Sequence, residues 1–472
     1  MFVTSPELPP TQSLLATDAP ARPRLRDALF APVDIAPIIF FRISFGLLMF
    51  IEVLAYTFYG PVADNWAAPK FHFTYFNFEW VKAPPGNWMY ALCGVMMLSA
   101  LAITAGFFYR TAALIFAIGF SWFFLIEQAQ YMNHFYLICL IGFTAVFLPA
   151  QRALSFDCWR KPGLRADTAP AWNLWLLQAH MAIAYFFGGI AKINSDWLRG
   201  EPIRTWLFTG NMGEKVPAAL KFEEMVYLLS YGGLLLDLLA APFLIWRKTR
   251  LFALAAAIIF HLSNAYLFKI GVFPFLSIIM TLLFLSPSWF RKILRLRPAA
   301  TPATAYWSCS TAIVVLLVIY GAYHFLMPLR HWLYPGNVHW TEEGHRYSWH
   351  MMLRTKKGNA YFVVEDRKTK ELWRVQPRPY LSARQNNKMA VQPEQLLQFA
   401  HYLRERWSPR DVAVYAVSEV RLNDHKPALL VDPEVDLSRV ERSLKPASWI
   451  LPFGNDRPIP RRFRFTKEAP RP

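Results

Sequence analysis

Long apolar runs, separated by short polar intervals, dominate the first two thirds of the chain. Most of these runs have the length of roughly twenty residues that an α-helix needs to cross a bilayer core of about 30 Å. We therefore predict about nine membrane-spanning helices. They run approximately over Pro37–Tyr59, Trp88–Phe108, Thr111–Gln130, Asn133–Pro149, Trp172–Lys192, Met225–Trp246, Leu251–Phe268, Phe273–Ser286 and Trp307–Pro328. The eighth run is short, which indicates a partly re-entrant segment.

The pattern changes after Pro328, where apolar and polar residues begin to alternate. Alternation with period two predicts strands, and apolar residues spaced three and four apart predict a helix. The predicted fold is a polytopic α-helical membrane protein with a C-terminal extramembrane α+β domain. In that domain we expect strands over Ser348–Thr355, Ala360–Glu365, Glu371–Val375 and Asp411–Leu422, and a helix over Glu394–Trp407.

These patterns divide the chain into four units. Residues 1–32 are expected to form a flexible cytoplasmic N-terminal tail, and residues 33–330 the transmembrane helical domain. Residues 331–457 are expected to form the extracytoplasmic α+β domain. Residues 458–472 are rich in Arg and Pro, which predicts a loose basic tail.

Composition excludes a soluble enzyme and suggests an orientation. Of the 472 residues, 55% are hydrophobic and 16% aromatic, which indicates an integral membrane protein embedded in the lipid bilayer. The net charge of +18 does not point to nucleic acid, because many basic residues lie in short loops on one side of the predicted helices. By the positive-inside rule these loops and the N-terminus are cytoplasmic, and everything after Pro328 is extracytoplasmic. Since the sequence shows little sign of a eukaryotic targeting signal, we expect a bacterial inner-membrane protein whose active site faces the periplasm.

Lys192 is the first candidate for chemistry, because it ends an apolar helix of about twenty residues. Desolvation disfavours a charged amine, so a lysine at the mouth of an apolar pocket can act as a base. The alternative is an ordinary anchor that reaches the lipid headgroups. Trp197 follows within the same stretch and is expected at the same pocket.

Further polar residues are predicted to gather at this face of the bundle. His134, beside Asn133, opens the fourth span, and His324 lies one turn below the outer end of the ninth. His261 and Asn264 share one side of the seventh span and lie deeper in the membrane. For His134, a hydrated interfacial histidine and a functional one are equally compatible with the sequence.

Glu52 and Asp237 place two carboxylates inside apolar spans. Burying a carboxylate is costly, so we expect these residues to pair with each other or with a basic group as structural charges.

Motifs of several other chemistries are absent from the sequence. It contains no Walker loop, dinucleotide fingerprint, HExxH motif or nucleophile elbow. The four cysteines, Cys93, Cys139, Cys158 and Cys309, show no metal-ligand spacing. We therefore expect no metal.

Six sequence blocks, in order along the chain, resemble the vitamin K-dependent gamma-glutamyl carboxylase family, whose members carry the HTTM domain. The blocks are MNHFYL at Met132–Leu137, YFFGGIAKINSDWLRG at Tyr185–Gly200, GGLLLDLLAAPFL at Gly232–Leu244, FHLSNAYLFKIGVFPF at Phe260–Phe275, SPSWFRK at Ser286–Lys292 and YSWHMM at Tyr347–Met352. The resemblance extends from about Phe41 to about Pro452, and it rests on all six blocks in order, because one block alone would be weak.

The resemblance implies a reaction. A reduced naphthoquinone, either reduced vitamin K or a menaquinol, reacts with O₂ to give an epoxide and a strong base, which removes a γ-proton from a glutamate side chain that then captures CO₂. By this resemblance Lys192 matches the base that deprotonates the quinol, and His134 matches an active-site histidine. His261 and Asn264 match a family motif and are expected at the quinol pocket with Asn133, Trp197 and His324. A glutamate-containing protein or peptide is the implied partner.

Two departures limit the transfer from the family. Animal members have a longer C-terminal lumenal portion, and His350 stands where their YSWHMM-like block carries an acidic residue. Docking of a propeptide-bearing substrate therefore does not follow from the resemblance. Two alternatives to the carboxylase remain: a quinol epoxidase without carboxylation, and a membrane protein that binds a quinone or lipid without chemistry.

Overall fold

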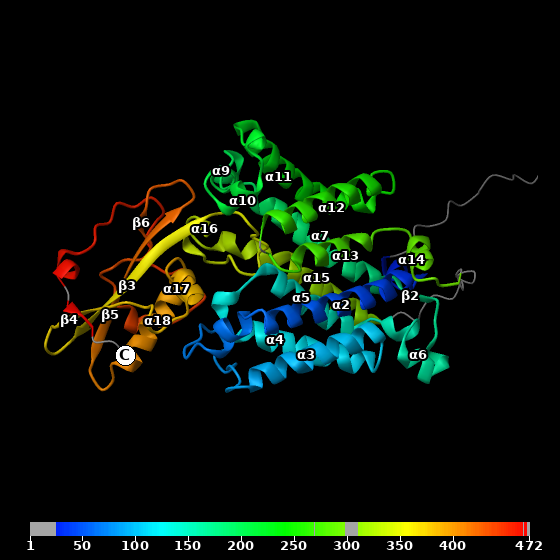
Figure 1. Ribbon diagram of the computed structural model, residues 1–472, viewed down its shortest axis with the longest axis horizontal. Coiled ribbons are helices and arrows are strands. Elements are labelled where there is room, and N and C mark those ends of the chain that lie inside the picture. The colour runs from blue at the N-terminus through cyan, green and yellow to red at the C-terminus, as the bar shows by residue number, and fades with distance from the viewer. Residues whose placement is uncertain (1–24, 269, 298–309, 466, 470–472) are drawn as a thin grey trace, which may run out of the picture.

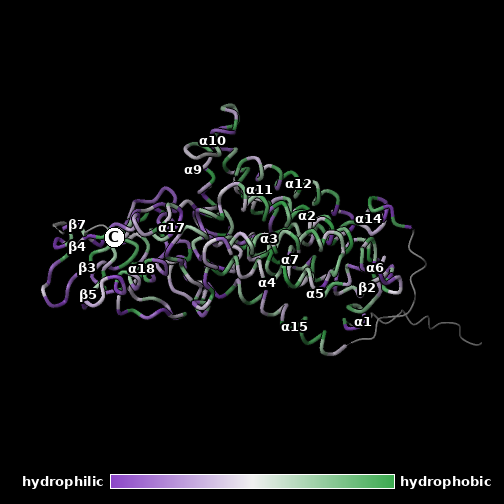
Figure 2. Tube along the Cα trace, turned by 60° about the horizontal axis from the view of Figure 1, so that its bottom comes forward, coloured by the Kyte–Doolittle hydropathy of each residue, from purple (hydrophilic) through white to green (hydrophobic). Residues whose placement is uncertain are grey.

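The computed structural model describes residues 25–268, 270–297, 310–465 and 467–469. Most of the predicted N-terminal tail, the start of the ninth predicted span and Cys309 lie outside the described residues. Within the described part, a helical bundle occupies one end of the molecule and a sheet domain the other (Figure 1). The bundle is mainly hydrophobic and the sheet domain more hydrophilic (Figure 2).

The bundle contains one helix for each predicted span. They are α2 (Ala36–Phe58), α3 (Trp88–Ala105), α4 (Tyr109–Ile126), α5 (Asn133–Phe147), α7 (Ala171–Ala191), α11 (Glu223–Ile245), α12 (Arg250–Leu267), α13 (Phe273–Leu282) and α15 (Thr311–Leu326). Shorter helices connect them: α1 (Leu25–Leu29), α6 (Phe156–Arg160), α8 (Ser195–Leu198), α9 (Ile203–Phe208), α10 (Asn211–Lys215), α14 (Pro287–Ile293) and α16 (Val338–Thr341).

The structure confirms a polytopic helical membrane protein but lowers the number of spans. Among the described residues, seven helices are long and apolar enough to cross a membrane. The predicted re-entrant character of the eighth run agrees with a bend of 116° between α13 and α14, which together can count as an eighth span. The α5 helix has only 15 residues, shorter than the roughly twenty that a full crossing needs.

The two ends of the bundle differ. At the end that we call the domain side, the segment between α7 and α11 meets the sheet domain, and Trp206 of this segment donates a hydrogen bond to Thr355 over 2.8 Å. At the opposite end, called the basic side, β1 (Pro32–Asp34) pairs with β2 (Thr168–Pro170). Arg291 binds Asp34 there at 2.6 Å. Residues 32–34 are therefore a strand held by the bundle, at the predicted boundary between the tail and the helical domain.

The sheet domain has five strands in the order β6-β5-β3-β4-β7. The central pair is β3 (Lys356–Asp366) and β5 (Val412–Leu422), antiparallel along their whole length. The remaining strands are β4 (Leu372–Val375), β6 (Ala428–Leu429) and β7 (Lys467–Glu468). Two helices, α17 (Ala383–Met389) and α18 (Pro393–Arg406), complete the domain, which confirms the predicted α+β organisation.

One predicted strand is wrong: residues 348–355 form a loop. Tyr347, Trp349 and Met352 have φ angles of 65°, 57° and 52°, which no strand contains. The apolar residues alternate here because Trp349 enters the core of the helical bundle, where its exposed fraction is 2% and its ring lies 5.4 Å from that of Tyr136. The YSWHMM segment (residues 347–352) thus inserts a side chain into the core of the bundle. We call this segment the capping loop.

The C-terminal segment is more ordered than predicted. The Phe463 side chain is fully buried against the sheet domain, and β7 pairs in parallel with β4. The described part of residues 458–472 is therefore packed and not a loose tail.

Buried polar contacts fix the sheet domain on the bundle. Gln385 of α17 donates to Glu127 at the end of α4 over 2.7 Å, and Gln128 donates to Glu394 of α18 over 3.0 Å. Buried amides and carboxylates need such partners, so these bonds specify one docking geometry. The domain can thus place its side chains over the bundle reproducibly.

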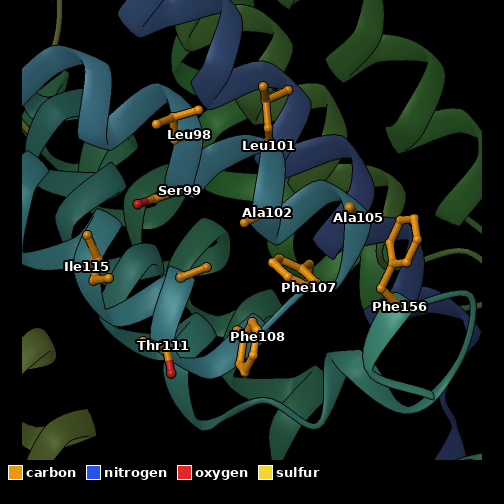
Figure 3. Close-up of a pocket in the computed structure, with 11 residues that line it drawn as sticks. Leu98, Ser99, Leu101, Ala102, Ala105, Phe107, Phe108, Thr111, Ile115 and Phe156 are labelled. Carbon is orange, nitrogen blue, oxygen red and sulfur yellow. The ribbon is translucent and has the colours of Figure 1, made fainter. Parts of the chain in front are cut away.

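An apolar groove lies between α3 and α4 at their basic-side ends (Figure 3). It is at the opposite end of the bundle from Lys192, so it is not the candidate site described below. Its lining residues are Leu98, Ser99, Leu101, Ala102, Ala105, Phe107, Phe108, Thr111, Ala112, Ile115 and Phe156.

Candidate functional site

Lys192 is a buried partner of Asp237 and not an anchor at the headgroups. The residue caps the C-terminus of α7, and only 5% of its surface is exposed. Its Nζ lies 2.5 Å from Oδ2 of Asp237 on α11 and 3.2 Å from the carbonyl oxygen of Gly188. The ring of Trp197 lies 5.3 Å from the same Nζ. The predicted desolvation is present, together with a carboxylate that the prediction did not assign to Lys192 in particular.

The turn after Lys192 is fastened to α11. The Asn194 side chain caps α8 by accepting a bond from the Trp197 amide at 3.0 Å. The Trp197 indole in turn donates to the Ser230 carbonyl at 2.9 Å. A Cβ on Gly189 would lie 2.9 Å from the Leu238 amide nitrogen, so only glycine allows α7 and α11 to approach this closely. The short distance between the two helices brings Lys192 and Asp237 together.

The two predicted structural carboxylates have different outcomes. Asp237 pairs with a basic group, as expected. Glu52 does not: its Oε1 is buried and has no hydrogen-bond partner within the described residues. The reason is the arrangement of helices, because α2 packs on α3 whereas α11 packs on α7. Glu52 instead faces an aromatic pocket that includes Tyr56 and Phe135.

His134 and Asn133 open α5 on the domain side. The His134 Nε2 is buried and has no hydrogen-bond partner among the described residues, and the ring lies 5.6 Å from that of Phe273. Asn133 donates to the carbonyl of His350 at 3.0 Å and accepts a bond from the Tyr131 hydroxyl at 3.0 Å. Such an unused buried nitrogen is costly unless a ligand meets it. Nε2 of His134 is therefore available for a hydrogen bond to a ligand.

His261 belongs to a hydrogen-bonded group on the other side of Phe273. Its Nε2 lies 2.6 Å from the hydroxyl of Tyr185, which also lies 3.0 Å from Oγ1 of Thr281. The ring centroids of His261 and Phe273 are 6.1 Å apart. The half-buried side chain of Asn264 forms no hydrogen bond within the described ranges. Phe273 thus separates His134 from His261.

The capping loop connects the two halves of the site. The His350 carbonyl binds Asn133, next to His134. A Cβ on Gly188 would lie 3.1 Å from Oδ2 of Asp237 and 3.3 Å from Cε of Met351. One loop therefore covers both the Lys192–Asp237 pair and the start of α5.

The structure does not place His324 beside Lys192. His324 is buried between α15 and α5, with its ring 6.0 Å from that of His180 and 6.5 Å from that of Tyr136. His180 lies twelve residues before Lys192 on α7, which is about 18 Å along a helix. The sequence correctly places His324 in the last turn of its helix. It does not predict which side chains surround His324.

Two cations on α17 were missed by the sequence prediction. Arg384 and Lys388 lie one helical turn apart, and neither side chain forms an ion pair or hydrogen bond within the part of the chain that the structure describes. Arg384 is exposed and close enough to Tyr56 and His134 to act on them electrostatically. Like charges at this spacing repel, so an anion between them would be favoured. No sequence motif marks α17, and only the docking of the domain brings it over His134.

His350 of the capping loop lies at the centre of a histidine cluster. Its ring lies 4.8 Å from that of His331, 5.3 Å from His339 and 5.2 Å from His345, and both of its nitrogens are buried without a hydrogen-bond partner. Burial lowers the pKa of His350 well below its usual value. The cluster does not have the geometry of a metal centre, and the described residues contain no other His, Cys, Asp and Glu group that does.

Comparison with known families gives two matches that follow the two parts of the fold. Residues 30–289, the helical bundle up to α14, match the HTTM domain. Residues 309–456, which include α15 and most of the sheet domain, match the vitamin K-dependent gamma-carboxylase, lumenal domain. No solved structure matches the chain.

Proposed function

Since the chain belongs to the vitamin K-dependent gamma-carboxylase family, we propose that it couples epoxidation of a reduced naphthoquinone by O₂ to carboxylation of glutamate side chains with CO₂. The family assignment indicates a gamma-carboxylase-like enzyme of the membrane, and the substrates are reduced vitamin K or a menaquinol. The observation that carries the proposal is the buried Lys192–Asp237 pair under the capping loop.

Lys192 is the proposed base. For Lys192 to act as this base, Asp237 must hold the proton of the pair when the quinol binds. Lys192 Nζ then has a lone pair and accepts the proton of a quinol hydroxyl. The resulting ammonium stays opposite the deprotonated oxygen and stabilises it. The capping loop limits the access of water, which protects the strong base that the oxygenated quinol supplies.

Arg384 and Lys388 are the proposed ligands of the substrate carboxylate. Neither side chain forms an ion pair with a carboxylate in the described structure, and α17 contacts residues 128–130 at the end of the bundle. A peptide glutamate held there would present its γ-carbon towards His134, near which Arg384 lies. A carboxylated product carries a second negative charge, which two cations also accommodate.

Removal of these cations is expected to weaken peptide binding without removing quinol chemistry. We expect Arg384→Gln and Lys388→Met each to raise the apparent KM for a glutamyl peptide about 10-fold or more, because a charged hydrogen bond contributes about 1.5–3 kcal/mol. The epoxide yield from saturating quinol should stay within about twofold. Arg378→Gln, an exposed change in the same domain, is the control. Unchanged KM values in both variants would contradict this role.

Lys388 should give peptide binding a pH dependence. Burial lowers the pKa of Lys388 to about 8, and the nearby charge of Arg384 acts in the same direction. Lys388 is charged below this pH and neutral above it, so the apparent KM for the peptide should rise as pH increases through about 8. Because the folded-state pKa is below the usual 10.5, the free energy of unfolding should rise over the same interval, up to pH 10.5. The Lys388→Met variant should show neither change.

We also propose that the domain side faces the periplasm of a bacterial inner membrane. The basis is the positive charge of the loops on the opposite side. A phosphatase fused after Pro328 should therefore be active, and one fused at Arg165 inactive. The reverse pattern would invert the proposed orientation.

Incorporation of labelled CO₂ tests the proposed reaction. The purified protein, given reduced vitamin K, O₂ and a glutamyl peptide, should transfer label to the peptide and form the quinone epoxide. Epoxide without labelled peptide would restrict the function to quinol epoxidation.

A further inference from the structure

A second group of polar side chains lies inside the membrane, apart from Lys192 and Asp237. His180 of α7 bonds Thr144 of α5 at 2.9 Å and lies 3.4 Å from the hydroxyl of Tyr320 on α15. His324, one turn further along α15, packs edge-on against Tyr320, with ring centroids 4.2 Å apart. Polar groups within membrane spans are costly, and they usually mark a functional site.

His324 has no hydrogen bond to explain its burial. Only 4% of its surface is exposed, and its contacts within the described residues are with the rings of Tyr136, His180, Tyr320 and Tyr323. The hydroxyl of Tyr136 also has no hydrogen-bond partner within the described ranges. Two polar side chains with no hydrogen bond among the described residues therefore lie next to each other, one on α5 and one on α15, with ring centroids 6.5 Å apart.

The helix that carries His324 packs loosely on the bundle. Only 11% of the most apolar stretch of α15 is buried, against 56% for α2. His324 is the one buried residue of α15 among those described. A polar site behind a weakly packed helix is accessible to a ligand that arrives through the bilayer.

Aromatic side chains connect this group to the candidate active site. The ring of Tyr136 lies 4.9 Å from that of Tyr347 in the capping loop. The amide of Tyr347 donates to the Tyr131 hydroxyl at 2.6 Å, and Tyr131 bonds Asn133. A flat, apolar ring with two polar oxygens could contact these residues in succession on its way from the membrane to His134.

We propose that His324 and Tyr136, supported by His180, form a binding site for a naphthoquinol head group between α5, α7 and α15. There the quinol is received from the bilayer before it reaches Lys192. A neutral histidine can accept the hydrogen bond of a quinol hydroxyl, and the rings of Tyr320 and Tyr323 offer stacking surfaces. The inference rests on the proposed function for the identity of the ligand, but it concerns a site about 18 Å along α7 from Lys192.

Binding and turnover, measured separately, test this site. The full-length protein in phosphatidylcholine nanodiscs would be labelled with a photoreactive azido-naphthoquinone, and labelled peptides would be identified by mass spectrometry. We expect label on α15 and α5. His324→Leu, which keeps the apolar volume, should weaken binding of the quinone probe about three- to tenfold, the effect of one neutral hydrogen bond. The same variant should raise the KM for quinol by a similar factor and leave kcat within about twofold.

Two further variants make the result interpretable. Tyr136→Phe should have the same direction of effect as His324→Leu, because it removes the second free polar group. Val318→Leu is the control, since Val318 lies on the same helix and is 63% exposed. Wild-type probe binding by both His324→Leu and Tyr136→Phe, or label confined to helices other than α5, α7 and α15, would overturn the inference. If the His324 and Tyr136 variants bind the probe more weakly than the wild type but the wild type forms no epoxide, the result would support this binding site. It would contradict only the proposed function.

Discussion

Replacement of Lys192 with alanine is expected to abolish quinol epoxidation and to destabilise the protein as well. The activity is lost because the base is removed, and general-base catalysis contributes about 10²–10⁴-fold. The stability is lost because Asp237 remains buried without its partner, which costs about 3–5 kcal/mol in comparable pairs. Epoxide yield and thermal unfolding in detergent measure the two effects.

Two further changes at this pair separate catalysis from folding. The double variant Lys192→Met with Asp237→Leu replaces the ion pair by apolar groups of similar size, and it should recover most of the stability but none of the activity. Lys192→Arg preserves the positive charge, and it should be inactive because a guanidinium does not release its proton at ordinary pH. Near-wild-type turnover by the arginine variant would refute the role of Lys192 as a base.

Replacement of His134 should cause a large loss of activity with little loss of stability, unlike replacement of Lys192, which should reduce both. The Nε2 of His134 has no hydrogen-bond partner in the described structure, so its removal leaves no buried group unpaired. His134→Leu keeps an apolar side chain beside Phe273 and should fold normally. If His134 contacts the reacting substrate, kcat/KM for epoxidation should fall at least about 100-fold.

A matched control tests whether this effect belongs to the site. His401 lies on α18, where its ring bonds the Val440 carbonyl at 2.8 Å, far in the sequence from the bundle. His401→Leu should leave epoxidation close to wild type and lower stability slightly. Equal activity of the His134 and His401 variants would show that His134 is only an interfacial histidine.

The elements that sequence predicts well are those determined by local pattern. The length of the apolar runs predicts that α2 and α7 are long enough to span the membrane, and the alternation of apolar and polar residues predicts the strand Val412–Leu422. Both predictions use only residues that are close together in the sequence. The same reasoning failed for the capping loop. Its alternation arises from Trp349 packing in the bundle, which is a tertiary contact that no local pattern records.

For the candidate site, the sequence identifies candidate residues but not the residues that they contact. Lys192, His134 and Asp237 are unusual in their apolar surroundings, so the sequence alone identifies them. Their partners depend on which helices pack together, and this explains why Asp237 meets Lys192 while Glu52 remains alone. Arg384 is an ordinary basic residue in the sequence, and only the position of α17 over the bundle makes it a candidate.

The most direct test of the central claim follows epoxide formation and CO₂ incorporation in one reaction mixture. Wild-type protein, the Lys192→Arg variant and the His134→Leu variant would each receive reduced vitamin K, O₂, labelled CO₂ and a glutamyl peptide. The account predicts both products from the wild type and neither above background from the variants. Absence of epoxide from stable, folded wild-type protein with either reduced vitamin K or menaquinol would contradict it.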